Sequence, residues 1–305
     1  MLVTMTQTAE RPGESLRSVF STTNGVLYVF DPSARTLRAV VEAAAAELGP
    51  GETHRRPSAE NDSETPTPSR EGTDAARDAG TATPAVRVVA TGSRLREFRD
   101  DFGAAALAAE LVADDRLGLR ATAALDGTPV AASRSQVYVP VVVNGTNTGV
   151  AAAAAPFTDE VFRQCASAWE EGTPFDLRTP PLSTIRETLT AEFGPDARAD
   201  FDAVLTTVER DHDPTAFDPV TAALLVVARH RQLLYDVSNW GADVGLASKA
   251  TFSRKKNRLE DLGVVETERE SVPTGRPRQR LFLTETYRNR IDDEGPASVL
   301  AGVLV

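Results

Sequence analysis

The sequence predicts an α+β protein in several parts. An N-terminal α/β domain, with a partly parallel sheet and flanking helices, precedes a smaller C-terminal domain of three helices and a hairpin. Apolar strand-like runs alternate with amphipathic helical stretches before residue 170. After residue 213, three short helical segments are followed by two strand-like runs around a Pro/Gly-rich turn. A length of 305 residues is enough for about two domains.

Strands and helices alternate through residues 14–170, which we predict to be a regulatory or oligomerisation domain. Strands are expected at 26–30, 86–90, 117–122 and 136–143, and helices at 33–48, 94–112 and 157–169. This order favours parallel pairing of at least some strands. Asp31 and Ser93 follow the first two strands, at the sheet edge where α/β domains bind ligands, so a small-molecule effector could bind there. The alternative is that both residues simply cap the following helices.

Two segments are predicted to be disordered, namely a tail at 1–13 and an insert at 50–84. The insert contains no Val, Ile, Leu, Met, Phe, Trp or Tyr. Such a segment cannot bury enough apolar surface to offset the entropy of ordering it. A domain boundary in this place is the alternative, but it would leave a single strand–helix unit to fold alone.

The remaining parts outside the C-terminal domain are less regular. Residues 171–213 are predicted to form a helical linker or a dimer seam, because Ile185 and Leu189 are spaced for one helix face and Phe201, Val204 and Val208 for another. Residues 286–305 are expected to be a C-terminal tail.

The segment 214–285 has the elements of a winged helix-turn-helix in order. Asp218-Pro219 begins a first helix, and a second covers residues 234–240. Ser248 caps a third, which continues to Leu262 and ends at Gly263. Strands at 263–268 and 280–283 enclose a turn that carries arginines.

The third helix is predicted to face inward with Phe252, Leu259 and Leu262. Lys256 interrupts this pattern four residues after Phe252. We expect its stem to lie along the edge of the core while its ammonium reaches solvent or DNA.

Charge is distributed unevenly along the chain. The net charge is −11, which argues against non-specific coating of nucleic acid. Residues 246–290 nevertheless hold 11 basic and 6 acidic side chains, a net charge of +5, and the remainder of the chain therefore carries −16. All three lysines, Lys249, Lys255 and Lys256, lie in this stretch. Such asymmetry is typical of a nucleic-acid contact.

Together these features predict a sequence-specific, DNA-binding transcriptional regulator with double-stranded DNA as its partner. The recognition helix Ser248–Leu262 would enter the major groove, and the wing at Thr274–Arg280 would reach the minor groove or the backbone. Arg254 is the expected base contact, because its planar fork can pair two acceptors of guanine, and Lys249, Lys255 and Arg258 are expected at phosphates. The expected DNA-binding residues are Ser248, Lys249, Thr251, Arg254, Lys255, Arg258, Arg276, Arg278 and Arg280.

Other interpretations remain open at this point. A basic helix can be merely a solvated face, and the winged helix could contact protein in a ligand-sensing or docking module. An enzyme is not expected, because His54, His212 and His230 are scattered, Cys165 has no partner, and no phosphate-binding Gly motif occurs. We therefore predict no catalytic residue, cofactor or metal. The absence of a signal peptide or an apolar run of membrane-spanning length predicts a cytoplasmic location.

The acidic, nearly lysine-free composition is typical of a cytoplasm of very high salt, although a GC-rich genome also favours Arg over Lys. The sequence resembles the TbsP-type transcriptional regulators of halophilic archaea. The resemblance is close over 234–283, read as LYDVSNWGADVGLASKATFSRKKNRLEDLGVVETERESVPTGRPRQRLFL, and extends to 177–181 and 198–205. It implies a cytoplasmic, dimeric transcription factor whose DNA-facing residues map onto Ser248–Arg258 and Arg276–Arg280. The N-terminal part is less similar, and the insert at 50–84 is unusual for the family.

Overall fold

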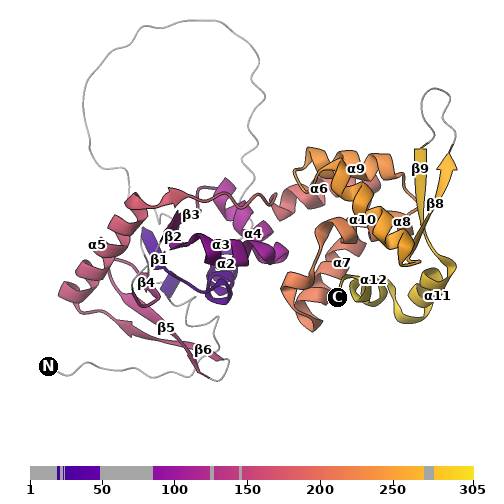
Figure 1. Cartoon of the computed structure of the whole chain (residues 1–305). Helices are drawn as coiled ribbons and strands as arrows, with labels where there is room; N and C mark the ends of the chain where they lie inside the picture. Colours follow the sequence, from indigo (N-terminus) through magenta and orange to yellow (C-terminus); the bar gives the residue numbers. More distant parts are fainter. Residues whose placement is uncertain are drawn as a thin grey trace, which may run out of the picture.

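The computed structural model describes residues 19–20, 23, 25–48, 85–123, 127–143, 146–270 and 278–305. The predicted disordered tail at 1–13 and insert at 50–84 lie outside these residues, as does the wing turn at 271–277 with Arg276. The described residues form an N-terminal α/β half and a C-terminal, mainly helical half (Figure 1).

The N-terminal half is built on a seven-stranded mixed sheet in the order β6-β5-β4-β1-β2-β3-β7. The strands are β1 (Val26–Phe30), β2 (Ala85–Thr91), β3 (Leu117–Thr122), β4 (Val130–Ala132), β5 (Val137–Val143), β6 (Thr146–Ala152) and β7 (Thr173–Pro174). β1, β2 and β3 pair in parallel, as their helical connections require, and the other pairings are antiparallel. The predicted partly parallel sheet is therefore confirmed.

Helices cover both faces of this sheet. The helices are α2 (Ala34–Leu48), α3 (Gly92–Asp100), α4 (Phe102–Ala113) and α5 (Ala155–Glu171). Leu27 and Val29 of β1 join the core under α2, α3 and α4, whereas Tyr28 and Phe30 pack on the opposite face with Cys165 of α5. Successive side chains of β1 therefore point to opposite faces of the sheet and contribute to two separate cores.

The single helix predicted over 94–112 is wrong, because it is divided into α3 and α4 at Asp101. Asp101 has extended dihedral angles, and its carboxylate accepts a hydrogen bond from the Ala104 N–H at 3.2 Å. An Asp in this position satisfies free N–H groups at the start of a helix, so it begins α4 instead of continuing α3.

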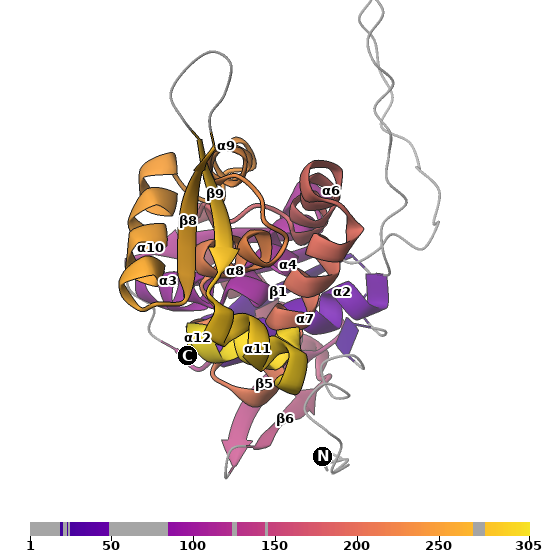
Figure 2. The same cartoon turned by 90° about the vertical axis from the view of Figure 1, so that its right-hand side faces the viewer.

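The C-terminal half encloses one core. Its elements are α6 (Leu182–Phe193), α7 (Pro195–Asp211), the 3-10 helix η1 (Pro214–Ala216), α8 (Pro219–Arg229), α9 (Leu234–Asp243), α10 (Lys249–Asp261), β8 (Val265–Glu270), β9 (Arg278–Leu283), α11 (Glu285–Glu294) and α12 (Pro296–Leu304). Three short helices, α8, α9 and α10, followed by the β8–β9 hairpin match the predicted winged helix-turn-helix (Figure 2).

Two segments outside the predicted 214–285 belong to the same core. Ile185 and Leu189 of α6 and Phe201 of α7 are fully buried with the winged helix, so the apolar faces considered for a dimer seam are used within the chain. Residues 286–305 form α11 and α12 in place of a tail, and Leu300 of α12 is completely buried. Among the described residues, no helix is long and apolar enough to cross a membrane.

Candidate nucleic-acid interface

α10 lies close to α9 because a glycine stands at the point of contact. A Cβ on Gly241 would lie 2.2 Å from the Phe252 ring, which is fully buried, so only glycine allows the two helices to approach this closely. α9 is fixed in turn by Trp240, whose indole N–H donates to the Thr188 hydroxyl of α6 at 3.0 Å. The orientation of α10 therefore depends on both neighbouring helices.

The two ends of α10 are set by local signals that the sequence predicted. The Ser248 hydroxyl accepts a hydrogen bond from the Thr251 N–H at 3.2 Å, which satisfies one of the free donors of the first turn. The Thr251 hydroxyl lies 3.0 Å from the same Ser248 oxygen. Gly263 has a φ of +66°, the left-handed conformation that ends many helices.

The inward face of α10 differs from the prediction. Phe252 and Leu259 are buried as expected, but Leu262 is 62% exposed and Lys256 takes the third inward position at 6%. The Lys256 ammonium donates to Glu260 at 2.8 Å, and the Thr267 hydroxyl donates to the same carboxylate at 2.7 Å. The prediction that this ammonium reaches solvent or DNA is wrong, because one helical turn brings it a carboxylate partner.

Burial alone would raise the pKa of Glu260, but the hydrogen bonds from Lys256 and Thr267 hold it below its ordinary value. Lys256 and Glu260 are therefore a structural ion pair within α10, on its inward side. They balance each other and contribute no net charge to the outer surface.

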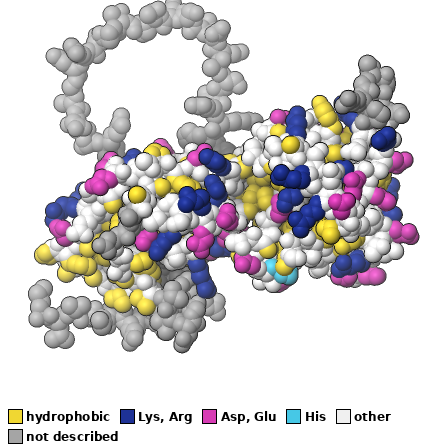
Figure 3. Space-filling view, in the orientation of Figure 1, with side chains coloured by type: hydrophobic (Ala, Val, Ile, Leu, Met, Phe, Trp, Pro, Cys, Tyr) yellow, Lys and Arg dark blue, Asp and Glu magenta, His cyan; other side chains and the backbone are white. Residues whose placement is uncertain are grey.

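The outward face of α10 carries cations that form no ion pair within the described part of the chain. Lys249, Arg254 and Arg258 are exposed, and none of them forms an ion pair with another described residue. Ser253 and Asn257 are exposed on the same face, and the helical spacing of 253, 254, 257 and 258 was the signal that could have added them to the prediction. Dark blue side chains gather over the position of α10 in the space-filling view (Figure 3).

Lys255 is set apart from these three cations. Its ammonium donates to the carboxylate of Asp218, which also caps α8 by accepting from the N–H groups of Val220 and Thr221 at 3.2 and 3.4 Å. Burial would raise the pKa of Asp218, and the bonds from Lys255 and Thr221 overcome this and lower it. Lys255 thus joins α10 to α8, and a phosphate would have to compete with that carboxylate.

Two arginines of the wing hairpin, Arg278 and Arg280, contact protein groups. Arg280 donates to Glu270 at 2.5 Å and to the Arg231 carbonyl at 2.6 Å, which braces β9 against β8 and the end of α8. Arg278 lies 4.4 Å from the centre of the half-exposed Tyr235 ring of α9, near Asp236 at 3.8 Å. Tyr235 was not among the predicted site residues. The strands of the wing run over 265–270 and 278–283, so the hairpin is longer than predicted.

The two N-terminal candidates lie at neighbouring strand ends. Asp31 is 6% exposed with a φ of +47°, and its Oδ1 is buried with no hydrogen-bond partner. Burial raises the pKa of this carboxyl, although Arg94, 3.1 Å from its Oδ2, opposes the shift. Ser93 lies in the first turn of α3 and contacts the Thr91 hydroxyl at 3.0 Å. The helix caps are Ser33 for α2 and Thr91 for α3, so neither Asp31 nor Ser93 serves as a cap.

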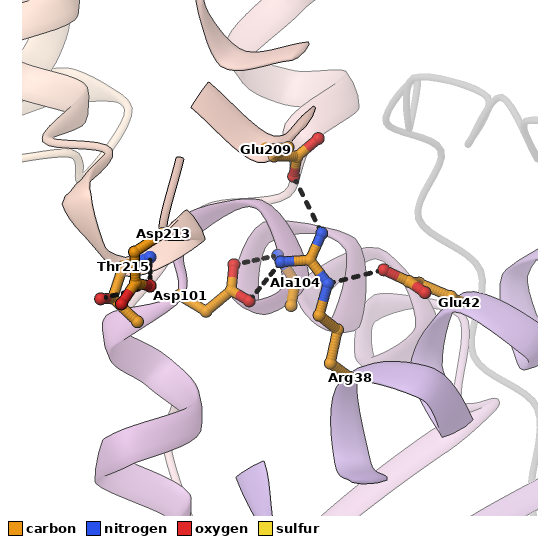
Figure 4. Close-up of polar contacts among 7 residues, drawn as sticks. All are labelled: Arg38, Glu42, Asp101, Ala104, Glu209, Asp213 and Thr215. Carbon is orange, nitrogen blue, oxygen red and sulfur yellow. Dashed lines mark hydrogen bonds and ion pairs between the residues drawn. The ribbon is translucent and has the colours of Figure 1, made fainter. Parts of the chain in front are cut away.

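A polar cluster joins the two halves. Arg38 of α2 donates to Glu42 at 2.7 Å and to Asp101 at 2.6 Å, and lies 3.6 Å from Glu209 of α7 (Figure 4). Burial raises the pKa of Glu209. The Phe102 ring stacks on Phe217 beside this cluster, with centroids 5.3 Å apart. These contacts join α2 and α4 of the N-terminal half directly to α7 and to Phe217, which follows η1.

Among the described residues, His230 and Cys165 are candidates for metal or thiol chemistry. No group of three His, Cys, Asp or Glu side chains there could hold a metal ion. His230 lies 2.7 Å from Asp200, which also pairs with Arg229. Burial raises the pKa of the Cys165 thiol to about 11, so this cysteine is not a reactive thiolate.

Family comparisons agree with this geometry. Residues 181–301 match the family model described as "Transcriptional regulator TbsP-like, C-terminal HTH domain", and residues 65–180 match "Transcriptional regulator TbsP-like, N-terminal". The chain belongs to the TbsP-like transcriptional regulators. The two matched segments meet between residues 180 and 181, next to Leu182, where the C-terminal core begins. The α10 surface thus belongs to the helix-turn-helix domain of a DNA-binding regulator.

No curated protein matches the sequence. Among solved structures, a chain from "Structure of TrmBL2, an archaeal chromatin protein, shows a novel mode of DNA binding" is similar at 10% identity, over 56% of this chain and 53% of that chain. The match therefore spans about half the length of the TrmBL2 chain. Its TM-score is 0.31, which is too low to support a conclusion about this molecule.

Proposed function

We propose that this TbsP-like regulator binds specific DNA sequences by inserting the outward face of α10 into the major groove. The observation that carries the proposal concerns three exposed cations on one helix of a chain whose net charge is −11. Lys249, Arg254 and Arg258 form no ion pair with any residue that the structure describes. An exposed cation with no carboxylate partner is free to meet a phosphate or a base edge. A recognition helix supplies this surface in helix-turn-helix proteins.

Different roles follow from the chemistry of the side chains. Arg254 is proposed to read a guanine, because its two terminal nitrogens can pair with O6 and N7 together. Lys249 and Arg258 lie toward the two ends of the helix and are proposed to contact phosphates. Ser253 and Asn257 lie between them and can add hydrogen bonds to bases. The wing is proposed to contact the adjacent minor groove or backbone through Arg276 and Arg278. Arg280 donates to Glu270 and to the Arg231 carbonyl, so it would have to leave these partners to join them.

We propose that the regulator works in the cytoplasm as a homodimer. Two copies would present two α10 helices to half-sites about one turn of DNA apart, which increases both affinity and selectivity. At the high salt of the proposed halophilic cell, phosphate attraction is largely screened. Base contacts such as that of Arg254 then contribute a larger share of the binding free energy.

The test compares Arg254→Ala with Arg258→Ala on an operator found by genome-wide immunoprecipitation of the tagged chain. Arg254→Ala should remove the preference for the operator over a scrambled duplex, whereas Arg258→Ala should weaken binding to both duplexes about equally. If Arg254→Ala leaves the preference intact, the assigned role of Arg254 is wrong.

A small-molecule effector near Asp31 is a second proposal. It is favoured by the buried, unpartnered Oδ1 of Asp31, held in left-handed backbone at the carboxyl end of β1, with Ser93 at the end of the neighbouring strand. A hydroxyl or amine of a ligand could donate to this oxygen after neighbouring side chains move, because the oxygen itself is buried. Thermal unfolding of the full chain against a metabolite panel, with Asp31→Asn as the control, would detect such a ligand. A flat response of the wild type to all compounds would contradict the proposal.

A further inference from the structure

The hairpin at one edge of the sheet is unusual in its lack of charge. From Ser135 to Thr158 there is no Asp, Glu, Lys or Arg in 24 consecutive residues, although charged residues make up 25% of the chain. This interval contains β5, β6 and the start of α5. A chain of net charge −11 repels a second copy of itself least where its surface is neutral.

β6 is the outer strand of this hairpin and an edge of the sheet. It pairs with β5 over seven residues, and no other described strand covers its outer side. Exposed edges are commonly protected by charged residues or proline, but β6 reads TNTGVAA and contains neither. The opposite edge of the sheet is β7, which has only two residues. Of the two edges of the described sheet, β6 is therefore the one with a long row of backbone groups that no described strand pairs.

Exposed apolar side chains occur in β6 itself and in the first turn of α5, the helix that follows β6. Val150 pairs with Val139, and partners in register share a face. Val139 packs with the cluster around Cys165, which places Val150 on the α5 side, where it is 50% exposed. Phe157 in the first turn of α5 is 49% exposed.

The opposite face of the hairpin is already filled. A Cβ on Gly149 would lie 2.1 Å from the Tyr138 ring, so this ring covers the glycine and packs across both strands. An aromatic side chain over a strand glycine in this way supports the pairing of β6 with β5. The Tyr138 ring thus packs against Gly149 on this face and leaves the outer side of β6 available for pairing.

We infer that a second copy of this chain pairs with β6, strand against strand, and that this pairing forms the homodimer proposed above. Antiparallel pairing of β6 with its own copy follows a two-fold axis perpendicular to the sheet. The β6 edges of both copies are then paired, so a third copy cannot bind through β6. That axis places the two α5 helices on the same face of the continuous sheet. Val150 and Phe157 then approach their counterparts and lose exposed apolar surface.

The first test is the mass of the full chain in solution by light scattering during gel filtration. The wild type should elute at twice the 32.6 kDa of one chain, and Val150→Lys should be a monomer. The matched control is Val112→Lys, because Val112 of α4 is similarly exposed at 42% and lies outside the neutral hairpin. A monomeric wild type would overturn the inference, as would a Val150→Lys protein that remains dimeric.

The second test does not depend on how well Val150→Lys folds. A spin label on Val150→Cys should report a distance to its counterpart below about 25 Å, because paired strands lie about 4.8 Å apart and a seven-residue strand extends about 23 Å. The native Cys165 is buried with a raised pKa and should not react with the label. Labels on Val112→Cys should be farther apart. A dimer in which the Val150 labels are the farther pair would contradict pairing through β6.

Both measurements are made without DNA. A β6-paired dimer that failed to bind DNA would contradict the proposed function and leave this inference standing. A monomer that bound its operator would contradict this inference and leave the proposed DNA binding standing.

Discussion

Lys255 and Arg258 lie three residues apart on α10 but should behave differently when each is changed to alanine. Lys255 donates to Asp218, and the side chains of this pair are 34% and 29% exposed. Arg258 is exposed and has no described partner. The prediction is that Lys255→Ala mainly lowers stability, whereas Arg258→Ala mainly lowers affinity for DNA.

The expected magnitudes follow from these surroundings. The Lys255–Asp218 pair is partly exposed and also supports a helix cap, so it should contribute about 1 kcal/mol to the free energy of unfolding. This is near the upper end for surface ion pairs. Breaking a fully buried pair costs more, about 3–5 kcal/mol. Losing one phosphate contact should reduce the slope of log K against log salt by about 0.9. A tenfold rise in salt should therefore cost the wild type about eightfold more affinity than it costs Arg258→Ala.

The assay is fluorescence anisotropy of a labelled operator, titrated with each full-length variant at several KCl concentrations, together with urea unfolding of the same samples. Lys255→Ala should keep the salt slope of the wild type and show a lower free energy of unfolding. If Lys255→Ala instead reduces the slope as much as Arg258→Ala does, the lysine leaves Asp218 when DNA binds, and the reasoning from the free structure fails.

Three further predictions concern contacts made by residues of the C-terminal half. Gly241→Ala should lower the free energy of unfolding by about 1–3 kcal/mol, because its Cβ meets the Phe252 ring, whereas Gly302→Ala enters open space in α12 and should be neutral or stabilising by up to about 1 kcal/mol; equal losses in urea unfolding would contradict this. Because the pKa of Asp218 is lowered in the folded protein, its contribution to stability is present above about pH 4 and is lost as pH falls through that lowered pKa. Asp218→Asn should therefore lose less stability than the wild type when the pH falls from neutral to about pH 3. The pKa of Glu209 is raised, so its contribution to stability has the opposite sign and declines as pH rises. The thermal stability of Glu209→Gln relative to the wild type should therefore increase above about pH 5. If Glu209→Gln instead becomes less stable relative to the wild type as pH rises, burial is not the cause of the shift.

The sequence was most informative where local signals agree with tertiary packing. Ser248 and Gly263 mark the ends of α10 because a cap and a left-handed glycine act on the nearest backbone groups. The parallel pairing of β1 with β2 follows from the helix that connects them. These features depend on residues within a few positions of one another or on a simple connection rule.

The sequence was least informative where a distant residue decides the outcome. Lys255 looks like any other cation of α10, but Asp218, 37 residues earlier, engages it. Lys256 occupies a core position because Glu260 and Thr267 satisfy its charge there, and Leu262 is left outside. β6 escaped prediction because four of its seven residues are Asn, Gly or Ala, which have weak β propensity, and Tyr138 of the neighbouring strand supports it.

The central claim, that α10 reads the major groove through Arg254, is tested most directly by dimethyl sulfate protection of the operator. This reagent methylates N7 of guanine, which faces the major groove. The wild type should protect one or more guanines in each half-site, and Arg254→Ala should restore methylation at one of them while Arg258→Ala at saturating protein does not. An unchanged guanine pattern with Arg254→Ala, or no guanine protection by the wild type, would contradict the account.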